Sequence, residues 1–508
     1  MDLEKFRLRT FVARLVALGQ VEVHDEPVAL ADISRLVEAT PKAVLFRKAG
    51  PERSELVAAV SGSRECLAAA FGVDYRQLHE LTMRRMREPR KPVEIPSAEA
   101  PVHQVVLKGA EADLSKLPFH VQHELDGGVY ISSAIDYTVD PETGRSNVGC
   151  RRLMLRGRHH MRANLTAQSD LRAIYRKAVD RGERLNVTFV VGSHPIDFLA
   201  ATLRLPMDEI DLIATLRGEP VPVVRGVTND IRVPADAEMS IEGYFDELGY
   251  RELEGPYGEA NGYYGPMHID PVFHVTAITR RRDALFQTVV HAGADLTRAE
   301  WPNIGALNAE CGAWTALRAA GIEPVAVCAP PATGRQQHVR VAIRQTAPGL
   351  ARKVIAALFD VPRFKHVFVV DDDIDVFSDQ QVEWAMATRF RADRNLVVQS
   401  GFAPHYMDTS MDPGGKDQLT KVGFDMSVAF GRPDMIDYKV ARAARLDGKK
   451  QFASVRAALA SGPMYFAHLM EAVGSRDGRE VALELERLRE EGVLDRLDNG
   501  EWRLKPAG

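Results

Sequence analysis

Two glutamates in a glycine-rich segment are the first candidates for chemistry in this sequence. Glu254 and Glu259 stand in LEGPYGEANGYYG (253–265), separated by a Gly-Pro-Tyr-Gly turn. Glycine permits tight turns and close backbone approaches, so such a loop can direct both carboxylates into one pocket. Two carboxylates in one pocket suit acid–base work, because one can stay neutral while the other is ionised. An acidic surface loop is the alternative interpretation.

Two adjacent arginines on a predicted strand form the second candidate. Arg151 and Arg152 stand in SNVGCRRLMLRGRHHMRANL (146–165). Successive side chains of a strand point to opposite faces, so only one of the two can enter a cleft. An inward arginine offers a permanently charged fork that binds a carboxylate. The alternative is a solvated basic edge strand.

An apolar strand that ends in aspartates is the third candidate. The segment FVVDDDIDVF (368–377) carries Asp371, Asp372, Asp373 and Asp375. Acidic residues at the end of a buried strand often bind a divalent cation, and a DxD sequence there also occurs in nucleotide-sugar transferases. The alternative is acidic capping of the helix that follows, because aspartates favour helix N-termini.

A glycine-rich segment with two lysines is the fourth candidate. MDPGGKDQLTKVGFD (411–425) contains Lys416 and Lys421. Backbone N–H groups together with a lysine can hold a phosphate. The spacing does not match the GxxxxGK[ST] pattern, so a plain surface turn is the competing interpretation.

The elements that must position these residues change character along the chain. AVLFRKA (43–49) predicts a buried strand in a small α/β unit, and four prolines in 87–101 predict a boundary near residue 100. Short β-rich runs from 102 to about 300 predict a largely antiparallel sheet or barrel. After residue 300, helices alternate with strands, which indicates an α/β layer domain.

The last 48 or so residues form a unit of their own. A helix at 463–473 and an amphipathic helix at 481–492 precede two short strands joined around Asn499 and Gly500, a strong hairpin signal. The order of helix, helix and hairpin is typical of a winged helix.

Composition restricts the class of protein. The 508 residues (56.2 kDa) exceed one ordinary core and predict several domains, and 45% hydrophobic with 27% charged residues excludes a disordered chain. The net charge of −5, without long blocks of one sign, argues against a nucleic-acid partner. Four scattered cysteines fit a reducing cytoplasm. Because no secretory signal or membrane span is visible, we expect a cytoplasmic protein.

Taken together, these segments resemble the UbiD-type decarboxylase family, which works with prenylated flavin mononucleotide (prenylated FMN). The resemblance covers most of the chain. It depends on five motifs in a fixed order, NVGCRR (147–152), LRGEPVPVVRGVTNDIRVPADAEMSIEG (216–243), LEGPYGEANGYYG (253–265), VVDDDIDVFSDQQVEWAMATR (369–389) and TKVGFD (420–425). Five ordered motifs are far more specific than any one alone.

The resemblance implies the fold class α/β and β, in four parts. These are an N-terminal α/β region (1–101), a central split β-barrel flavin-binding domain (102–305), a C-terminal α/β oligomerisation domain (306–455) and a winged-helix-like tail (456–508) that is an addition to the family pattern.

The family's catalytic Glu-Arg-Glu network falls on Glu254, Arg152 and Glu259. Losing CO₂ from an sp² carbon leaves electrons that no ordinary side chain accepts, so a cofactor must act as the electron sink. A neutral carboxylic acid must then deliver a proton to the former carboxyl carbon. We assign this acid to Glu259, its ionised counterpart to Glu254, and the orientation of the substrate carboxylate to Arg152.

The resemblance also implies a metal, Mn²⁺ or Mg²⁺, that links the flavin phosphate to the protein through Asn, His and Glu. Asn147 matches the first ligand and Glu209 the last, while Asp170 takes the place of the histidine. A carboxylate is an acceptable hard ligand. K⁺ is a further candidate cation.

A further set of residues is assigned to the flavin by the same resemblance, with Lys421 as the phosphate-binding lysine. The set is Cys150, Arg151, Arg152, Arg162, Ala163, Asn164, Gln168 and Lys421. The expected partners are a small carboxylic acid substrate, a prenyl-flavin synthase that supplies the cofactor, and further copies of the chain in a homodimer or higher homo-oligomer. Neither nucleic acid nor membrane is expected as a partner.

The sequence therefore predicts a carboxy-lyase that catalyses reversible, non-oxidative decarboxylation of an aromatic, heteroaromatic or α,β-unsaturated acid. One alternative is a metal-dependent nucleotide-sugar transferase that uses the aspartate segment. Another is a DNA-linked regulator that uses the tail, although five glutamates against three arginines in the helix that would contact DNA (479–491) would repel phosphates. A protein-contact or oligomer-stabilising role for the tail is the simpler expectation.

Overall fold

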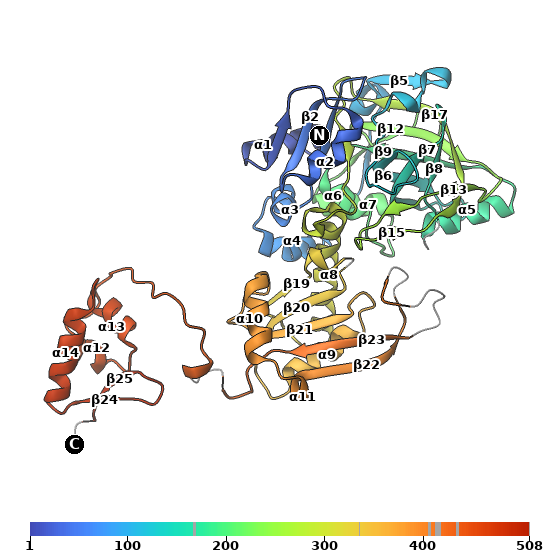
Figure 1. Cartoon of the computed structure of the whole chain (residues 1–508). Helices are drawn as coiled ribbons and strands as arrows, with labels where there is room; N and C mark the ends of the chain where they lie inside the picture. Colours follow the sequence, from blue (N-terminus) through green and yellow to red (C-terminus); the bar gives the residue numbers. More distant parts are fainter. Residues whose placement is uncertain (166–168, 335, 405–407, 412–417, 433–435, 507–508) are drawn as a thin grey trace.

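Six strands close into a barrel at the centre of the upper part of the molecule (Figure 1). This computed structural model describes residues 1–165, 169–334, 336–404, 408–411, 418–432 and 436–506. The barrel strands follow the order β12-β9-β6-β7-β8-β17, and β12 pairs with β17 to close it, while β5 extends the sheet beyond β17. Their bounds are β5 Val105–Lys108, β6 Tyr130–Val139, β7 Ser146–Leu155, β8 His160–Ala163, β9 Leu185–Val191, β12 Met239–Phe245 and β17 Val272–Arg280.

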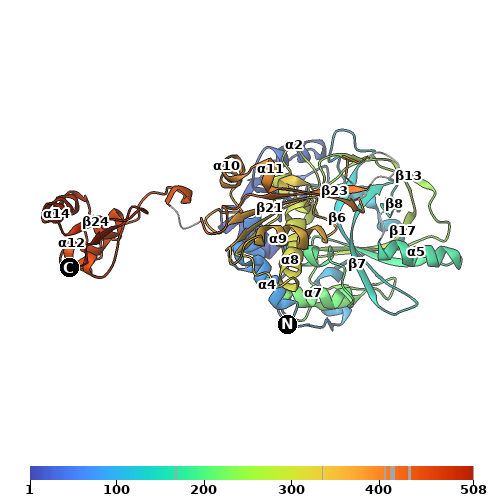
Figure 2. The same cartoon turned by 90° about the horizontal axis from the view of Figure 1, so that it is seen from below.

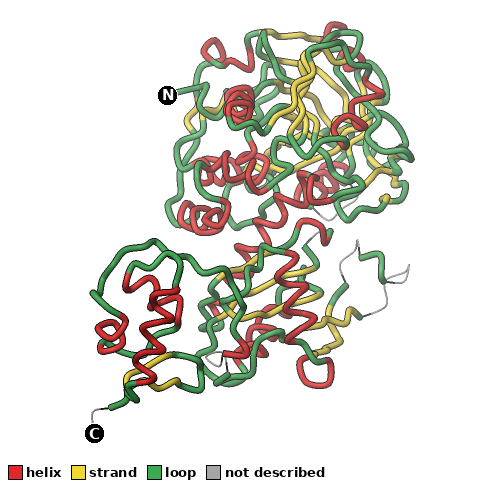
Figure 3. The backbone as a smooth tube through the Cα atoms, turned by 60° about the vertical axis from the view of Figure 1, so that its left-hand side comes forward, coloured by secondary structure: helices red, strands yellow, loops and turns green. Residues whose placement is uncertain are grey.

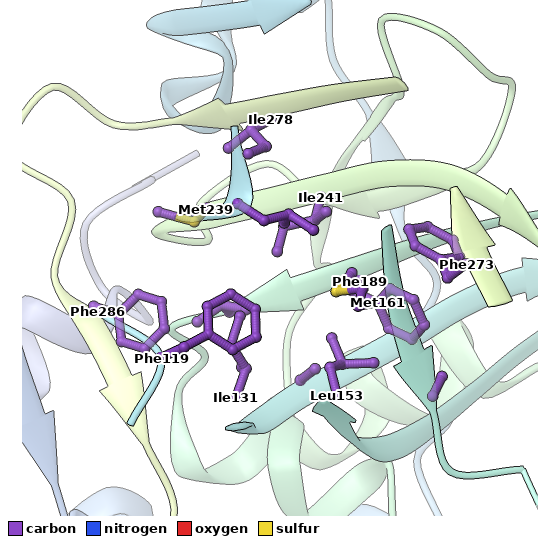
Figure 4. Close-up of a cluster of buried hydrophobic side chains, with 14 of the residues drawn as sticks. Phe119, Ile131, Leu153, Met161, Phe189, Met239, Ile241, Phe273, Ile278 and Phe286 are labelled. Carbon is purple, nitrogen blue, oxygen red and sulfur yellow. The ribbon is translucent and has the colours of Figure 1, made fainter. Parts of the chain in front are cut away.

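The barrel closes over an apolar core, which Figure 4 shows at close range. Phe189, Phe245 and Phe273 are fully buried, and their ring centroids lie 4.8 to 6.3 Å apart. The closing pair of strands approaches closely at Gly243, where a side chain would meet the carbonyl oxygen of His274 at 2.0 Å. Glycine is therefore required at this position of the closed barrel.

Helices and short strands surround the barrel. Helices α5, α6 and α7 occupy Asp170–Asp180, Pro195–Ala200 and Glu209–Arg217. A three-stranded sheet has the order β11-β10-β4, with β4 at Val93–Glu94, β10 at Pro222–Arg225 and β11 at Arg232–Pro234. Two small hairpin-like pairs carry the segment of the paired glutamates: β13 (Glu252–Glu254) with β16 (His268–Asp270), and β14 (Tyr257–Gly258) with β15 (Tyr264–Gly265).

The N-terminal region builds a separate four-stranded sheet with the order β1-β2-β3-β18. Its strands are β1 Val21–His24, β2 Ala43–Ala49, β3 Ser54–Ala58 and β18 Phe286–Thr288, and its helices are α1 Leu8–Ala17, α2 Ile33–Glu38, α3 Arg64–Phe71 and α4 Leu78–Arg85. The strand predicted at 43–49 is confirmed. We expected the run around 285–293 in the sheet or barrel, but β18 pairs in parallel with β3 and ties the two regions together.

A three-layer α/β domain follows below the barrel (Figures 1 and 3). Its sheet has the order β19-β20-β21-β23-β22, with α8 and α9 packed on one face and α10 on the other. The bounds are α8 Glu300–Ala319, β19 Ala326–Cys328, β20 His338–Ile343, α9 Leu350–Phe359, β21 His366–Asp371, α10 Asp379–Arg389, α11 Ala392–Asn395, β22 Leu396–Phe402 and β23 Leu419–Asp425.

The C-terminal tail stands apart from the other domains at the end of an extended segment (Figure 2). It contains α12 Val455–Ala460, α13 Phe466–Val473, α14 Arg479–Glu490, β24 Leu494–Arg496 and β25 Trp502–Leu504, around its own small core. The two predicted helices and the hairpin are confirmed, and α12 is an additional helix. No helix in the described part of the chain combines the length and apolar character needed to cross a bilayer.

A buried carboxylate joins three parts of this framework. Glu300, fully buried at the start of α8, accepts hydrogen bonds from the backbone N–H and hydroxyl of Ser61 (3.1 and 3.0 Å) and from the N–H of Val290 (2.9 Å). Burial raises the pKa of Glu300 to about 7, although these hydrogen bonds oppose the shift. The residue thereby ties the helix to the loop after β3 and to the segment after β18.

The raised pKa of Glu300 predicts a specific pH dependence of stability. Between its unfolded value of 4.5 and about 7, the folded protein holds a proton that the unfolded chain has released. The contribution of this pKa shift to the free energy of unfolding is therefore complete below pH 4.5. It is lost as the pH rises through about 7, and the total loss is about 3 kcal/mol. Urea unfolding of the wild type and Glu300→Gln across this range should show that the difference in unfolding free energy changes with pH. A constant difference would contradict the assignment.

Candidate functional site

One buried arginine holds both glutamates of the glycine-rich segment. Arg152 on β7 donates from Nε to Glu254 Oε1 (2.8 Å) and from Nη2 to Glu254 Oε2 (2.9 Å), a bidentate pair. Its Nη1 donates to Glu259 Oε1. Burial opposes the charge of Arg152, but the hydrogen bonds and negative charges of the two glutamates raise its pKa above the ordinary value. The guanidinium therefore stays charged and fixes the relative positions of two carboxylates.

The two glutamates differ in access to solvent. The Glu254 side chain is 0% exposed, whereas that of Glu259 is 18% exposed. Glu254 also accepts a hydrogen bond from Asn164 Nδ2 (3.3 Å), so its oxygens are occupied by protein donors. Glu259 is the carboxylate that a ligand can reach, while Glu254 compensates the charge of Arg152.

The ring of Tyr257 packs against the guanidinium of Arg152. The Arg152 guanidinium lies 4.7 Å from the centre of the Tyr257 ring, which is fully buried. The Tyr257 hydroxyl contacts Gln122 Oε1 and lies 2.9 Å from His291 Nδ1. A side chain at Gly258 would meet the His123 ring at 2.5 Å, so only glycine lets the turn before Glu259 lie this close. The glycine predicted in this turn is therefore needed because the backbone at Gly258 lies against the His123 ring.

A second buried group lies at the start of β7. Asn147 Nδ2 donates to Glu209 Oε2 (2.9 Å), and the N–H of Val148 also donates to this carboxylate. Asn147 Oδ1 is buried and accepts no hydrogen bond from a described residue. Burial raises the pKa of Glu209 to about 7, partly offset by the Val148 hydrogen bond, and the charges of Asp170 and Asp136 raise it further. Asn147 Oδ1 has no hydrogen-bond donor among the described residues, and burial disfavours the ionised form of Glu209. A cation bound between these two side chains would satisfy both groups.

The third predicted metal ligand, Asp170, belongs to the helix that follows β8. Asp170 is the first residue of α5 and is close enough for its charge to act on Glu209. Among the described residues, no three His, Cys, Asp or Glu side chains form a metal-binding group. Gln168, predicted to contact the flavin, lies outside the described residues.

The predicted flavin residues gather around β7 and β8. Arg151 forms an ion pair with Asp136 (3.1 Å) and donates to Ser169 Oγ (3.2 Å), while Arg152 engages the glutamates. The two arginines therefore use different faces of the strand, as the alternation of side chains predicts. The others lie nearby: Cys150 next to the Phe198 carbonyl, Arg162 paired with Glu252, Ala163 buried in the barrel core and Asn164 on Glu254.

Lys421, the predicted phosphate-binding lysine, does not lie among the predicted flavin residues on β7 and β8. It lies on β23 of the C-terminal sheet, and its ammonium donates to the carbonyl oxygens of Phe359 (2.6 Å) and Val361 (2.8 Å). Burial lowers the pKa of Lys421 to about 8. The assignment of Lys421 to a phosphate stays a prediction, because its contacts here are to the end of α9.

Each aspartate of the third candidate forms an ion pair with an arginine. Arg389 pairs with Asp371 (3.4 Å) and Asp373 (2.7 Å). Asp372 pairs with Arg344 (2.9 Å), and Asp375 with Arg76 of the N-terminal region (2.6 Å). These contacts are those of structural ion pairs and leave the segment little capacity for a catalytic cation.

The sequence interpretation missed Asp136 and Gln122. Asp136 on β6 is fully buried, and its oxygens accept no hydrogen bond from described residues despite the ion pair with Arg151. The single aspartate within the strand segment YISSAIDYTV (130–139) was the available signal, because a buried charge is costly unless it has a partner or a function. Gln122 offered no comparable signal, since its position depends on contacts with distant residues.

Comparison with known families matches the central part of the chain to two models. Residues 93–294 match the Rift-related domain of 3-octaprenyl-4-hydroxybenzoate carboxy-lyase (UbiD), and residues 303–426 match its C-terminal domain. Anhydromevalonate phosphate decarboxylase of Methanosarcina mazei is 30% identical over 82% of this chain and 95% of its own length.

Solved structures agree with these matches. The UbiD-class enzyme HmfF from Pelotomaculum thermopropionicum in complex with FMN is 30% identical, with a TM-score of 0.80 over 87% of this chain and 98% of that chain. An evolved dimeric form of HmfF was solved with prFMN. Vanillic acid decarboxylase of Sedimentibacter hydroxybenzoicus is 26% identical, with a TM-score of 0.78 over 87% of this chain and 96% of that chain.

The split barrel, the α/β domain and the matched domains define a carboxy-lyase. The chain belongs to the UbiD family of decarboxylases. The predicted family and fold class are thereby confirmed.

Proposed function

We propose that this protein catalyses the reversible, non-oxidative decarboxylation of an aromatic, heteroaromatic or α,β-unsaturated carboxylic acid with prenylated FMN. The observation that carries the proposal is the buried Arg152, which is shared by an enclosed Glu254 and a reachable Glu259. When bound, the flavin supplies the electron sink for the bond that breaks between the carbon and CO₂. The protein itself has to position the acid and deliver one proton to the carbon that has lost CO₂.

Each member of the network has a distinct task in this proposal. Arg152 orients the substrate carboxylate through its charge and also holds Glu259 in place. Glu254 stays ionised and neutralises Arg152, so that the arginine can remain buried. Glu259 gives its proton to the carbon that has lost CO₂ and regains a proton from water. In the reverse direction, the same carboxylate accepts the proton from that carbon.

The cofactor assignment is supported by the relatives and by the basic residues near β7. HmfF was solved with FMN and with prFMN. In this chain, Arg151 and Arg162 lie on β7 and β8, next to the network, where they can hold an anionic flavin. A prenyl-flavin synthase supplies the cofactor in this proposal.

The metal assignment depends on Asn147 and Glu209. We assign Mn²⁺ or Mg²⁺ to their oxygens, with Asp170 as the third ligand and K⁺ as a further cation. The buried oxygen of Asn147 without a partner among the described residues supports this assignment. Hard oxygen donors are what these ions prefer.

Other functions receive less support. The arginine pairs of Asp371 to Asp375 argue against a nucleotide-sugar transferase. In α14, Glu484 and Glu486 pair with arginines of the same helix, as on a solvated helix surface. We therefore assign the tail to protein contact or oligomer stabilisation in a homodimer or higher oligomer, not to DNA binding.

The flavin proposal predicts what co-production with a prenyl-flavin synthase changes. The purified protein should carry the mass and absorbance of prenylated FMN and release CO₂ from members of a panel of aromatic and α,β-unsaturated acids. Arg151→Ala should lower the retained flavin at least tenfold, because it removes a cation from the site. The exposed Arg145→Ala is the matched control and should retain it. A protein that binds no prenylated flavin would overturn the proposal.

Metal binding provides an independent test. Titration with Mn²⁺, followed by electron paramagnetic resonance, should give about one ion per chain. Asn147→Ala, Glu209→Gln and Asp170→Asn should each weaken binding by about tenfold or more. Asp180→Asn, at the exposed end of the same helix as Asp170, is the control and should bind normally. Unchanged binding in Asp170→Asn would remove Asp170 from the ligand set, and unchanged binding in all three would remove the site.

A further inference from the structure

A cavity of about 220 Å³ lies between the N-terminal region and the barrel. Four segments form its wall: residues 33–43, which run from α2 into β2, residues 59–66 after β3, residues 120–123 before β6, and residues 288–298, which begin at the end of β18. All of them belong to the part of the chain that the structure describes. No member of the catalytic network lines the cavity, and none of the described residues assigned to the flavin or the metal does. The cavity is therefore separate from the catalytic network.

Aliphatic side chains of both regions make up much of the wall. Ile33, Val37 and Ala43 come from the N-terminal region, and Val289 and Ala292 come from the segment after β18. Each of the five residues is at most 7% exposed. The transfer of a hydrocarbon from water onto such a surface is favourable, so the wall is suited to an apolar molecule.

Two polar side chains of the wall, Gln122 and His120, are already hydrogen-bonded within the protein. Gln122 Nε2 donates to the hydroxyls of Ser132 and Thr288 (2.6 and 3.0 Å), and its Oε1 accepts from the Tyr257 hydroxyl. The ring nitrogens of His120 lie 3.2 Å from a backbone carbonyl oxygen and 3.4 Å from Thr288 Oγ1. These groups are not free to compensate a buried charge or to hold an ordered water molecule.

The charged residues of the wall are exposed, and they carry both signs. Glu38 and Lys42 belong to the first wall segment, and Asp295 and Arg298 to the last. Arg298 pairs with Asp295 (3.2 Å), and Glu38 accepts a hydrogen bond from the N–H of Ala294 (3.0 Å). These exposed residues mark the opening to solvent, where a ligand can enter without meeting a net charge of one sign.

Hydrogen bonds join two of the wall segments before a ligand arrives. The buried Asn303 of α8 donates to the carbonyl oxygens of Gly62 (3.1 Å) and Thr297 (2.8 Å), which belong to the second and the last segment. Glu300 links the same two segments through its own hydrogen bonds. A site whose walls are fixed in advance loses little conformational entropy on binding.

A layer of side chains separates the cavity from Arg152. Gln122 and His123 line the cavity, and both contact Tyr257, Gln122 through its hydrogen bond and His123 through an edge-on ring contact at 5.2 Å. Tyr257 in turn packs against the Arg152 guanidinium at 4.7 Å. The layer closes the cavity toward the catalytic network. A ligand in the cavity therefore cannot touch Arg152, but it lies against the two side chains that hold Tyr257.

We propose that this cavity is a second binding site, which takes an uncharged aromatic or aliphatic molecule and acts on Tyr257 through Gln122 and His123. A cavity of ~150 Å³ with an aliphatic lining holds one benzene, so this cavity accommodates about six to ten non-hydrogen atoms. Because Tyr257 packs against Arg152, a ligand here adjusts the network without entering the catalytic site. The inference goes beyond decarboxylation and depends on neither the flavin nor the acid.

Calorimetry on the full chain tests the ligand class with two molecules of the same shape. Toluene should bind once per chain, with a dissociation constant below about 1 mM and a negative heat-capacity change, the mark of apolar burial. N-Methylpyridinium carries a positive charge within its ring and should bind at least tenfold more weakly, because the ring would bring this charge against the apolar wall. Equal affinities of the two molecules would overturn the inference.

Filling the cavity should remove toluene binding. Val37→Phe and Ala292→Leu, in two different wall segments, should each weaken toluene at least tenfold. Val106→Phe, at a 38% exposed residue of β5 that does not line the cavity, is the matched control and should bind toluene like the wild type. Melting temperatures identify the folded variants. An unchanged toluene affinity in the folded filling variants would overturn the inference.

Fluorine NMR measures whether occupation of the cavity reaches Tyr257. In protein labelled with 3-fluorotyrosine, the resonance that is missing from Tyr257→Phe belongs to Tyr257. Toluene should shift this resonance until it saturates, with the dissociation constant found by calorimetry, and the resonance of Tyr465 in the separate tail should stay in place. A Tyr257 resonance that does not move while toluene binds would overturn the inference.

These measurements separate the inference from the proposed function, because none of them uses flavin, acid or CO₂ release. Loss of the cavity site would leave the decarboxylase proposal standing. Toluene binding with the Tyr257 shift, in a protein that decarboxylates no acid, would support the cavity site and overturn the decarboxylase proposal.

Discussion

The burial of one arginine is the constraint on which the rest of the site depends. Arg152 is 6% exposed, and removing a guanidinium from water costs several kcal/mol unless partners replace the lost solvent. The bidentate contact with Glu254 provides that replacement, and the remaining nitrogen is left for Glu259. Because Glu254 holds one side of the Arg152 guanidinium in place, the other side can act on a ligand without a prior movement of solvent or side chains.

The fold supplies this geometry from separate elements. Arg152 comes from the middle of a barrel strand, whose position follows from the closed sheet and its aromatic core. The glutamates come from short strands and turns outside the barrel, which Tyr257, Gln122 and His123 pack into place. A rigid strand therefore carries the charge, and a shaped loop carries the group that exchanges a proton.

Much of the local structure could be predicted from the sequence, because its causes are local. Alternation separated the faces of Arg151 and Arg152, and the glycines around Glu254 and Glu259 indicated a turn. The closure of the barrel, the pairing of β18 with β3 and the distance of Lys421 from the network depend on contacts between distant segments. The hydrogen bonds of Gln122 are equally non-local, and the third metal ligand stays a prediction for the same reason.

Proton transfer by Glu259 is the central claim, and hydrogen exchange measures it without carbon–carbon bond cleavage. The decarboxylated product is incubated with flavin-loaded protein in D₂O, and deuterium at the former carboxyl carbon is followed by NMR. The wild type should exchange this hydrogen, and Glu259→Gln should slow exchange at least about a hundredfold, since general acid–base catalysis typically contributes that much. Its flavin content and melting temperature should match the wild type. Exchange at the wild-type rate in folded, flavin-loaded Glu259→Gln protein would contradict the account.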